Sequence, residues 1–456
     1  MAAPLAPLIV SVSGVRGIVG ESLTPEVAAR FAAALGTHLQ GEGGGGTVVV
    51  GRDSRPSGEM LKHAVLAGLF STGCRADDIG IAPTPTVGVA VTALGAAGGV
   101  QITASHNPAP WNGLKLFGPD GAVLPAEAGE RVKAIFEADE YKRVGWDGVG
   151  TLRRSPDPAD DHLRKVLDHV SVARVAAAGF SVFLDANGGA GGPLAARLLD
   201  ELGCRVTRHN CDPDGVFAHE AEPIPAHLAD VAPWVAQTGS AVGFVLDPDA
   251  DRLALIDEHG ECVSEELTLA LAVKYRLRQE AGLVVVNMST SRVIQDLAEA
   301  AGGTFQRTAV GEANVVEGMR AGGAVVGGEG NGGVIDPRVG WVRDPFIGMA
   351  LILSLLAEER KPLSQLVAEL PQYAMLKTKF ELPRAKLPGA FAALRTAWPA
   401  AAVDIRDGLR LDGPDWWLHV RGSNTEPVVR VIAEAPTAGQ ARQLCDEAGR
   451  IVRSGS

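Results

Sequence analysis

The sequence predicts a multidomain protein of the α/β class, with three α/β domains of mixed, mainly parallel sheets and a C-terminal α+β domain. Three observations lead to this prediction. The chain has 456 residues, whereas a single hydrophobic core stops growing near about 300 residues. Up to about residue 369, short apolar runs alternate with stretches whose apolar residues have helical spacing, as in βαβ units. Beyond that point, expected strands outnumber helices.

Five short apolar runs are expected to be strands of the α/β domains: Thr47–Val50, Ser181–Leu184, Ala241–Leu246, Leu283–Val286 and Ala324–Val326. Helices are expected at Pro25–Leu39, Pro193–Leu202 and Ser291–Ala301. Alternation of strands and helices implies right-handed crossovers, and ligands then bind at the carboxyl ends of the strands. The loops that follow these strands are therefore the first candidates for function.

The C-terminal part is expected to form an antiparallel sheet. Its strands are Ala374–Leu382, Ala402–Ile405, Trp417–Val420 and Val428–Ile432, and its helices are Gly389–Trp398 and Gly439–Val452. Thr437 and Gln440 fit a capping box at the start of the last helix. Segments rich in Gly, Pro and charge separate the units, and we expect domains at 1–155, 156–256, 257–369 and 370–456.

Composition excludes several classes of protein. Apolar residues make up 46% and charged residues 21%, and no apolar run is long enough for a membrane span. The 42 Lys and Arg against 54 Asp and Glu give a net charge of −12, the wrong sign for a nucleic-acid or anionic-membrane binder. The N-terminus has no basic stretch typical of a secretory signal, and the five scattered cysteines contain no C-x-x-C pair. A reduced, cytoplasmic location is expected.

A carboxylate-rich loop follows the expected strand Ala241–Leu246. Asp247, Asp249 and Asp251 stand at alternate positions and repel one another unless a hard cation such as Mg²⁺ or Ca²⁺ collects their oxygens. With Glu258 at its twelfth position, the segment nearly matches an EF-hand loop. That loop needs Gly at its sixth position and flanking helices, whereas Arg252 and strands are found here, so a Mg²⁺ loop is favoured.

A second loop, Thr103-Ala-Ser-His-Asn-Pro, contains Ser105 beside His106 and is followed by Lys115. Its side chains suit a polar turn that bonds its own backbone. They also suit an exposed nucleophilic serine. An unaided serine hydroxyl is a poor nucleophile, so the second interpretation requires a base or a metal from another loop.

A third loop, Gly327–Gly333, spells G-x-G-x-x-G, but no helix follows, so a dinucleotide site is discounted. Its Glu329 and Asn331, on a backbone with few side chains, suit hydrogen bonding to ligand hydroxyls, with a plain flexible turn as the alternative.

A fourth loop in an acidic protein combines arginines, hydroxyls and an amide, which suits phosphate: Arg421, Ser423, Asn424, Thr425 and Arg430. Arg16, near the start, is a further candidate for an anionic ligand. Arg52 and Asp53 are expected to form a structural ion pair.

Together these loops resemble the α-D-phosphohexomutase superfamily, which includes phosphoglucomutase, phosphomannomutase and phosphoglucosamine mutase. TASHNP with NGLK is similar to the phosphoserine loop, DPDADR to the Mg²⁺ loop, GEGNGG to the sugar loop and RGSNTEP to the phosphate loop. The matching segments run from Ser13 to Arg430 in the family's order. The resemblance implies four domains around a central cleft.

The resemblance also implies roles for the candidate residues. One Mg²⁺ would be held by Asp247, Asp249, Asp251 and the phosphorylated Ser105, with Lys115, Arg16 and His106 moving protons and stabilising charge. The substrate would be held by Arg252, Glu329, Asn331, Arg421, Ser423, Asn424, Thr425 and Arg430. Some family members carry His at the position of Gly333, so this chain depends more on Lys115.

The implied activity is the interconversion of hexose 1-phosphate and hexose 6-phosphate, with a hexose 1,6-bisphosphate as intermediate and activator. The implied substrate is glucosamine phosphate or glucose/mannose phosphate, handled by a monomer or homodimer. Two alternatives are a metal-dependent sugar phosphatase that uses the same serine and aspartates, and a non-catalytic sugar-phosphate binding protein.

Overall fold

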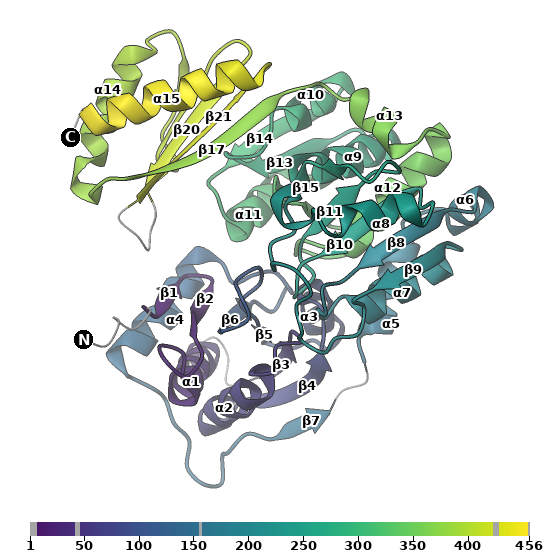
Figure 1. The fold of residues 1–456 in the computed structure, drawn as a ribbon. Coiled ribbons are helices and arrows are strands. Elements are labelled where there is room, and N and C mark those ends of the chain that lie inside the picture. Colours follow the sequence, from purple (N-terminus) through teal and green to yellow (C-terminus); the bar gives the residue numbers. More distant parts are fainter. Residues whose placement is uncertain (1–6, 42–45, 155–156, 423–427, 455–456) are drawn as a thin grey trace.

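The computed structural model describes residues 7–41, 46–154, 157–422 and 428–454, and four sheets follow one another along this part of the chain (Figure 1). We number the domains 1 to 4 after these sheets. The expected class, three α/β domains with mixed sheets and a C-terminal domain with an antiparallel sheet, is confirmed. The expected boundaries after residues 155, 256 and 369 stay predictions.

Domain 1 has a seven-stranded sheet in the order β1-β2-β6-β5-β3-β4-β7. Its strands are β1 Ile9–Ser11, β2 Gly14–Ile18, β3 Thr47–Arg52, β4 Arg75–Ile81, β5 Gly98–Ile102, β6 Trp111–Phe117 and β7 Leu152–Arg154. Strands β5, β3, β4 and β7 are parallel, while β1, β2 and β6 pair in antiparallel fashion. Its helices are α1 Pro25–Gly41, α2 Gly58–Ser71, α3 Thr84–Ala93 and α4 Ala126–Ala138. The Ser105 loop joins β5 to β6.

Domain 2 has a five-stranded sheet in the order β12-β11-β10-β8-β9, of which β10, β8 and β9 are parallel. The strands are β8 Ser181–Asp185, β9 Arg205–His209, β10 Val242–Leu246, β11 Leu253–Ile256 and β12 Cys262–Val263. Its helices are α5 Ala159–Leu167, α6 Val172–Ala178, α7 Gly192–Glu201 and α8 Ala232–Gln237. The aspartate loop joins β10 to β11. Because β12 pairs with β11, the second sheet extends past the boundary expected after residue 256.

Domain 3 has a four-stranded sheet in the order β14-β13-β15-β16, with β16 antiparallel to β15. Its strands are β13 Leu283–Asn287, β14 Thr304–Thr308, β15 Val326–Glu329 and β16 Gly333–Ile335. Its helices are α9 Glu265–Gln279, α10 Val293–Ala300, α11 Glu312–Gly322, α12 Pro345–Glu359 and α13 Leu363–Ala368. One apolar cluster contains residues of both domain 2 and domain 3, so these two domains share a core.

Domain 4 is an antiparallel sheet in the order β17-β21-β20-β19-β18, with both helices on one face (Figure 1). The strands are β17 Ala374–Glu381, β18 Ala402–Asp404, β19 Leu409–Asp412, β20 Trp417–Gly422 and β21 Val428–Ala435, and the helices are α14 Leu387–Ala397 and α15 Ala438–Ser454. Sequence analysis missed β19, which is short and half charged. At the start of α15, the backbone N–H of Gln440 donates to Thr437 Oγ1 at 3.3 Å. This bond is one half of the expected capping box.

A buried histidine joins the three α/β domains. His162 of α5 is fully buried, with Nδ1 2.9 Å from Thr86 Oγ1 on α3 and Nε2 2.8 Å from Asp344 Oδ2. Asp344 also caps α12 by accepting the N–H groups of Phe346 and Ile347. These contacts join α3 of domain 1, α5 of domain 2 and the start of α12 in domain 3.

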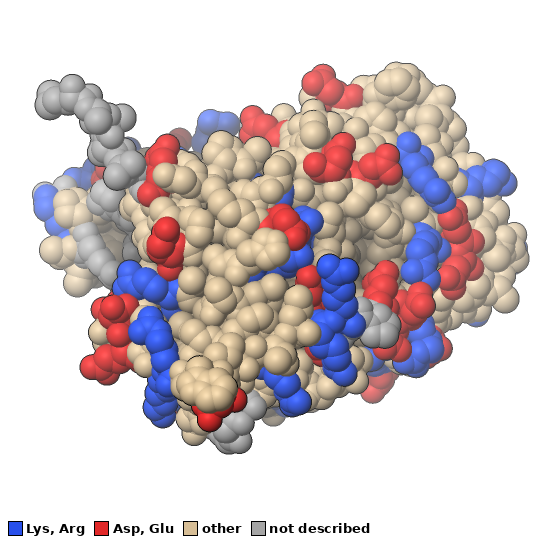
Figure 2. Space-filling view, turned by 90° about the horizontal axis from the view of Figure 1, so that it is seen from below, with Lys and Arg blue, Asp and Glu red and all other residues tan. Residues whose placement is uncertain are grey.

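Acidic and basic side chains are interspersed over the face seen in Figure 2, in agreement with the mixed charge of the sequence. Within the described ranges, no helix combines the length and apolar character that crossing a bilayer requires.

Candidate active site

The aspartate loop is a buried turn between β10 and β11. All three aspartates are fully buried, and one carboxylate oxygen of each lies within 4.8 Å of the others. Ala250 has φ +51°, so the chain reverses in the left-handed region. Asp247 Oδ1 accepts the N–H groups of Asp251 and Arg252, both at 3.0 Å, and closes the turn.

The loop has the properties of a site for a hard divalent cation. Asp249 Oδ1 and Asp251 Oδ1 are buried with no hydrogen-bond partner among the described residues, which is costly for charged oxygens. Burial, and then repulsion among the carboxylates, raises the pKa of both Asp247 and Asp249 above the usual range. A cation bound by oxygen ligands would relieve both costs, so the donor set fits Mg²⁺.

Asp251 differs from its two neighbours because cations surround it. Its Oδ2 accepts from Lys115 Nζ at 2.9 Å and from Arg343 Nη2 at 2.5 Å, and its Oδ1 lies 4.0 Å from Arg252 Nε. Burial opposes the charge of Asp251, but Arg343, Lys115 and Arg252 outweigh burial and hold its pKa well below the usual range. Asp251 is therefore ionised at neutral pH.

Ser105 lies against this loop, as the sequence predicted. Its Oγ is 3.3 Å from Asp247 Oδ2 and 3.4 Å from His106 Nδ1, and its N–H donates to Thr103 Oγ1 at 2.8 Å. The residue is buried and has φ +52°, an unusual conformation for a residue with a side chain. Sequence analysis missed Thr84, whose Oγ1 donates to Asp249 Oδ2 at 2.6 Å.

Two basic groups of domain 1, His106 and Arg16, are influenced by the charges of this site. Burial, and then the charges of Arg252 and Arg16, lowers the pKa of His106 to about 3, so its imidazole is neutral at physiological pH. Arg16 lies on β2 opposite Gly113 of β6. Burial lowers the pKa of Arg16, whereas Asp249 and Asp251 act in the opposite direction. His106 and Arg16 of domain 1 and Asp249, Asp251 and Arg252 of domain 2 therefore influence one another electrostatically across the interface of these domains.

Lys115 is buried on β6 between two carboxylates. Its Nζ is 2.9 Å from Asp251 Oδ2 and 3.0 Å from Glu312 Oε2. Burial alone would lower the pKa of Lys115, but Asp251 and Glu312 raise it above the usual value. Lys115 therefore stays an ammonium group, suited to stabilising negative charge or donating a proton.

The third loop turns between β15 and β16. Glu329 Oε1 accepts from Asn287 Nδ2 and Oε2 accepts from Arg343 Nη1, both at 2.8 Å. Asn331 Oδ1 is buried without a partner among the described residues, which leaves an acceptor for a ligand. A Cβ on Gly333 would lie 2.3 Å from Arg343 Cδ. Arg343 therefore occupies the space that a side chain at position 333 would need.

Arg343 and Glu312 connect the loops, and sequence analysis missed both. Arg343 donates to Asp251 and Glu329, its N–H donates to Glu312 Oε1 at 2.9 Å, and its Nε is 3.5 Å from Glu312 Oε2. Burial opposes the charge of Arg343, but these carboxylates outweigh burial and raise its pKa above the usual range. One guanidinium thus fixes the aspartate loop relative to the third loop.

The fourth loop belongs to domain 4. Arg421 on β20 and Arg430 on β21 are directly opposite, and Lys379 on β17 is opposite Arg430. Like charges opposite one another destabilise a sheet, and a bound anion would offset this cost. Arg421 Nε lies 3.3 Å from Asp407 Oδ2, which accepts the N–H of Val310 in domain 3. Three candidates lie outside the described residues: Ser423, Asn424 and Thr425.

The described part of the chain therefore brings three of the loops into contact. Ser105, Lys115, the aspartates and Glu329 form one connected network through Arg343. Arg421 and Arg430 belong to a different domain, and Figure 1 shows the ends of β20 and β21 that carry them directed toward domain 1.

Comparison with known proteins agrees with this arrangement. Four family models match in order: the phosphoglucomutase/phosphomannomutase alpha/beta/alpha domains I, II and III at residues 8–143, 160–260 and 265–373, and the C-terminal domain at 378–450. A protein named probable phosphoglucosamine mutase from Thermococcus kodakarensis is 37% identical over 447 residues, or 97% of each chain. The chain belongs to the phosphoglucomutase/phosphomannomutase family.

The resemblance to the α-D-phosphohexomutase superfamily is thereby confirmed, and the protein is an isomerase of the phosphohexomutase class. A second Thermococcus kodakarensis protein, named phosphoglucomutase/phosphomannomutase, is 38% identical over 95% of this chain and 96% of its own length. A solved phosphoglucomutase/phosphomannomutase family protein from Burkholderia thailandensis has a TM-score of 0.86 at 27% identity, covering 98% of this chain and 97% of that one.

The expectation that Arg52 and Asp53 form an ion pair in this phosphohexomutase is wrong. Asp53 pairs with Arg55, whose Nε is 3.0 Å from Asp53 Oδ2, while Arg52 Nε is 3.2 Å from Glu59 Oε2. Arg52 ends the strand β3, where successive side chains point to opposite faces, so Arg52 and Asp53 are directed apart.

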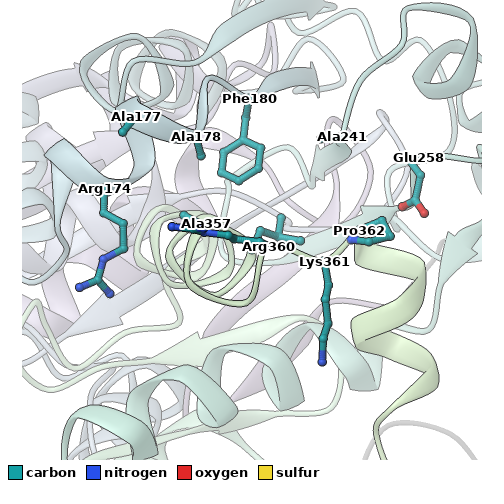
Figure 3. Close-up of a pocket in the computed structure, with 11 residues that line it drawn as sticks. Arg174, Ala177, Ala178, Phe180, Ala241, Glu258, Ala357, Arg360, Lys361 and Pro362 are labelled. Carbon is teal, nitrogen blue, oxygen red and sulfur yellow. The ribbon is translucent and has the colours of Figure 1, made fainter.

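A separate pocket of about 570 Å³ lies between domains 2 and 3 (Figure 3). Phe180 and Ala241 on its wall stand at the amino ends of β8 and β10. The aspartate loop follows the carboxyl end of β10, so this pocket is at the opposite edge of the sheet and is distinct from the candidate active site of the phosphohexomutase.

Proposed function

We propose that this phosphohexomutase interconverts hexose 1-phosphate and hexose 6-phosphate through a phosphoserine at Ser105, with glucosamine phosphate as the preferred substrate. One observation carries the proposal: Ser105 Oγ lies 3.3 Å from Asp247 Oδ2 in a cluster where two buried oxygens, Asp249 Oδ1 and Asp251 Oδ1, have no partner among the described residues. A phosphoryl group carried by this hydroxyl would lie next to a cation bound by the aspartates. The expected Mg²⁺ would be held by Asp247, Asp249, Asp251 and a phosphoserine oxygen, and would offset charge on the transferring group.

The transfer step itself involves two bonds. The bond between Ser105 Oγ and phosphorus breaks as a bond from phosphorus to a sugar hydroxyl oxygen forms, which yields a hexose 1,6-bisphosphate. The proton of the sugar hydroxyl is transferred to Ser105 Oγ as that oxygen leaves phosphorus, and His106, whose Nδ1 lies 3.4 Å from Ser105 Oγ, is placed to relay it. Lys115 and Arg16 stabilise the negative charge. The reverse transfer from the other end of the reoriented bisphosphate restores phosphoserine and releases the isomer.

Two kinds of contact would hold the sugar phosphate. Arg421 and Arg430, with Ser423, Asn424 and Thr425 as further candidates, would bind the phosphate that is not reacting. Arg252 would contact the reacting end. Glu329 and Asn331 would bind the sugar, and both present oxygen acceptors.

Acceptor oxygens at the sugar loop favour an amino sugar. The C2 ammonium of glucosamine can donate to a carboxylate and an amide oxygen, whereas a hydroxyl there gains less from the charge of Glu329. The 37% identical relative carries the name probable phosphoglucosamine mutase, which supports the same choice. The relative named phosphoglucomutase/phosphomannomutase keeps glucose and mannose phosphates as alternatives.

A coupled assay across glucosamine, glucose and mannose 1-phosphates, with Mg²⁺ and the matching 1,6-bisphosphate as activator, tests the proposal. We expect the highest kcat/KM with glucosamine 1-phosphate. Ser105→Ala should abolish turnover, whereas Ser171→Ala, an exposed serine whose side chain caps no helix, should not change it. Full turnover by Ser105→Ala would refute the phosphoserine mechanism. Free phosphate in excess of isomerised sugar would instead indicate the phosphatase alternative.

A further inference from the structure

The side-chain N–H groups of Arg55 donate to the Ser105 loop, to the first residue of β6 and to Asp53. The side chain is fully buried. Its Nε donates to Asp53 Oδ2 at 3.0 Å. Its two terminal nitrogens donate to four backbone carbonyls at 2.6–3.0 Å, those of Ser105, Asn107, Pro108 and Trp111.

No other side chain could make this set of bonds. Arginine alone has five N–H donors in a rigid planar fork. The carbonyls of Ser105, Asn107 and Pro108 lie between β5 and β6, outside the strands, and a carbonyl shielded from water without a donor is costly. The positions of these four carbonyl groups are therefore set by one guanidinium group.

The bond to the Ser105 carbonyl acts on an unusual conformation. Ser105 has φ +52°, which a residue with a Cβ adopts only when its surroundings compensate the cost. Arg55 Nη2 holds the carbonyl of Ser105 at 2.7 Å, and Thr103 Oγ1 holds its N–H at 2.8 Å. Both peptide groups of Ser105 are thus fixed, and with them the direction of its side chain.

Domain 2 covers this arrangement from the other side. The Arg55 Cζ lies 4.9 Å from the centre of the Phe217 ring. A Cβ on Gly215 would lie 2.2 Å from the carbonyl oxygen of Ser54, so the two backbones are in close contact. The domain that supplies the aspartates therefore also packs on the residue that shapes the Ser105 loop.

We propose that Arg55 is a positioning residue for phosphoryl transfer, which sets the orientation of Ser105 Oγ toward the aspartate loop. The inference rests on the proposed function of Ser105. Arg55 touches no reacting atom and acts through the carbonyls of residues 105 and 107. A change in the loop should therefore slow the chemical step and leave binding of the sugar phosphate unaffected.

The test compares Arg55→Lys with Arg52→Lys. Lysine keeps the charge but cannot reach four carbonyls and Asp53 together. We expect kcat for Arg55→Lys to fall by about 100-fold, as for a displacement of about 1 Å at a reacting group, with KM unchanged. Single-turnover formation of phosphoserine from glucose 1,6-bisphosphate, followed by mass spectrometry, should slow by the same factor. Arg52→Lys, whose side chain pairs with Glu59, should match the wild type.

A second pair of variants keeps the proposal testable if Arg55→Lys does not fold. Thr103→Val removes the acceptor for the Ser105 N–H and the 2.7 Å bond to Asp53 Oδ2, whereas Thr103→Ser keeps both. We expect the valine variant to lose kcat at constant KM and the serine variant to retain it.

The outcomes separate the inference from the proposed function. A purely structural role would lower the melting temperature and the folded fraction while phosphoserine forms at the wild-type rate in the folded molecules. That result overturns the inference alone. A wild-type kcat in Arg55→Lys does the same, and if that variant does not fold, a wild-type kcat in Thr103→Val does so. An inactive wild type that forms no phosphoserine overturns the proposed function and this inference with it.

Discussion

Asp249 and Asp251 lie in the same buried turn, yet their neutralisation should affect stability in opposite directions. Asp251 is paired with Lys115 and Arg343, whereas Asp249 accepts a hydrogen bond from Thr84 and faces two other carboxylates. Asp251→Asn therefore removes an attraction, and Asp249→Asn removes a repulsion.

The expected magnitudes follow from these contacts. Removing one partner of a buried ion pair costs about 3–5 kcal/mol, so Asp251→Asn should lower the free energy of unfolding by that amount. Burial, and then the charge of Asp251, raises the pKa of Asp249, and one pKa unit corresponds to about 1.4 kcal/mol. An asparagine oxygen can still accept from Thr84, so Asp249→Asn should leave the metal-free stability unchanged or raise it by about 1 kcal/mol.

Urea unfolding with EDTA and with Mg²⁺ measures both effects. A cation that binds only the folded state stabilises it by about 2.7 kcal/mol at 100 times its Kd, and both variants should lose this gain together with turnover. Asp168→Asn, at an exposed position, should change stability by less than about 0.5 kcal/mol. A metal-free Asp249→Asn less stable than Asp251→Asn would refute the electrostatic reasoning, and wild-type stabilisation by Mg²⁺ in both variants would refute the metal site.

Three other predictions concern single residues. Lys115→Met should lower kcat by about 10²–10³ because a buried cation next to Asp251 is lost, measured in the mutase assay. Gly330→Ala should lower the free energy of unfolding by about 1–3 kcal/mol and raise KM, because the new Cβ would lie 1.8 Å from Glu266 Oε2; unchanged urea unfolding would contradict this. Burial lowers the pKa of His419 to about 4, so the unfolded chain binds a proton first and stability falls by about 1.4 kcal/mol per pH unit from pH 6.5 to 4. His419→Gln should remove that part of the pH dependence of unfolding, and an unaltered slope would show that His419 is not its source.

Local patterns in the sequence were sufficient for the fold class and for two of the loops. Strands such as β8 and β13 are short apolar runs with clear limits, and the pattern of alternate aspartates requires either a cation or strong repulsion wherever the loop lies. The expected contact between Ser105 and the aspartate loop was found at 3.3 Å. Strand β19 was missed because its residues alternate between apolar and charged over only four positions.

The sequence by itself determined the architecture and the chemical character of each loop, because periodicity and residue type act over a few neighbouring positions. Only the tertiary structure decided which charges meet. Arg343 stands 92 residues from Asp251, Arg55 stands 50 from Ser105, and nothing near either arginine in the chain marks its partner. Electrostatic and hydrogen-bonding energies depend on distance in space, and the packing of loops within and between the domains sets that distance.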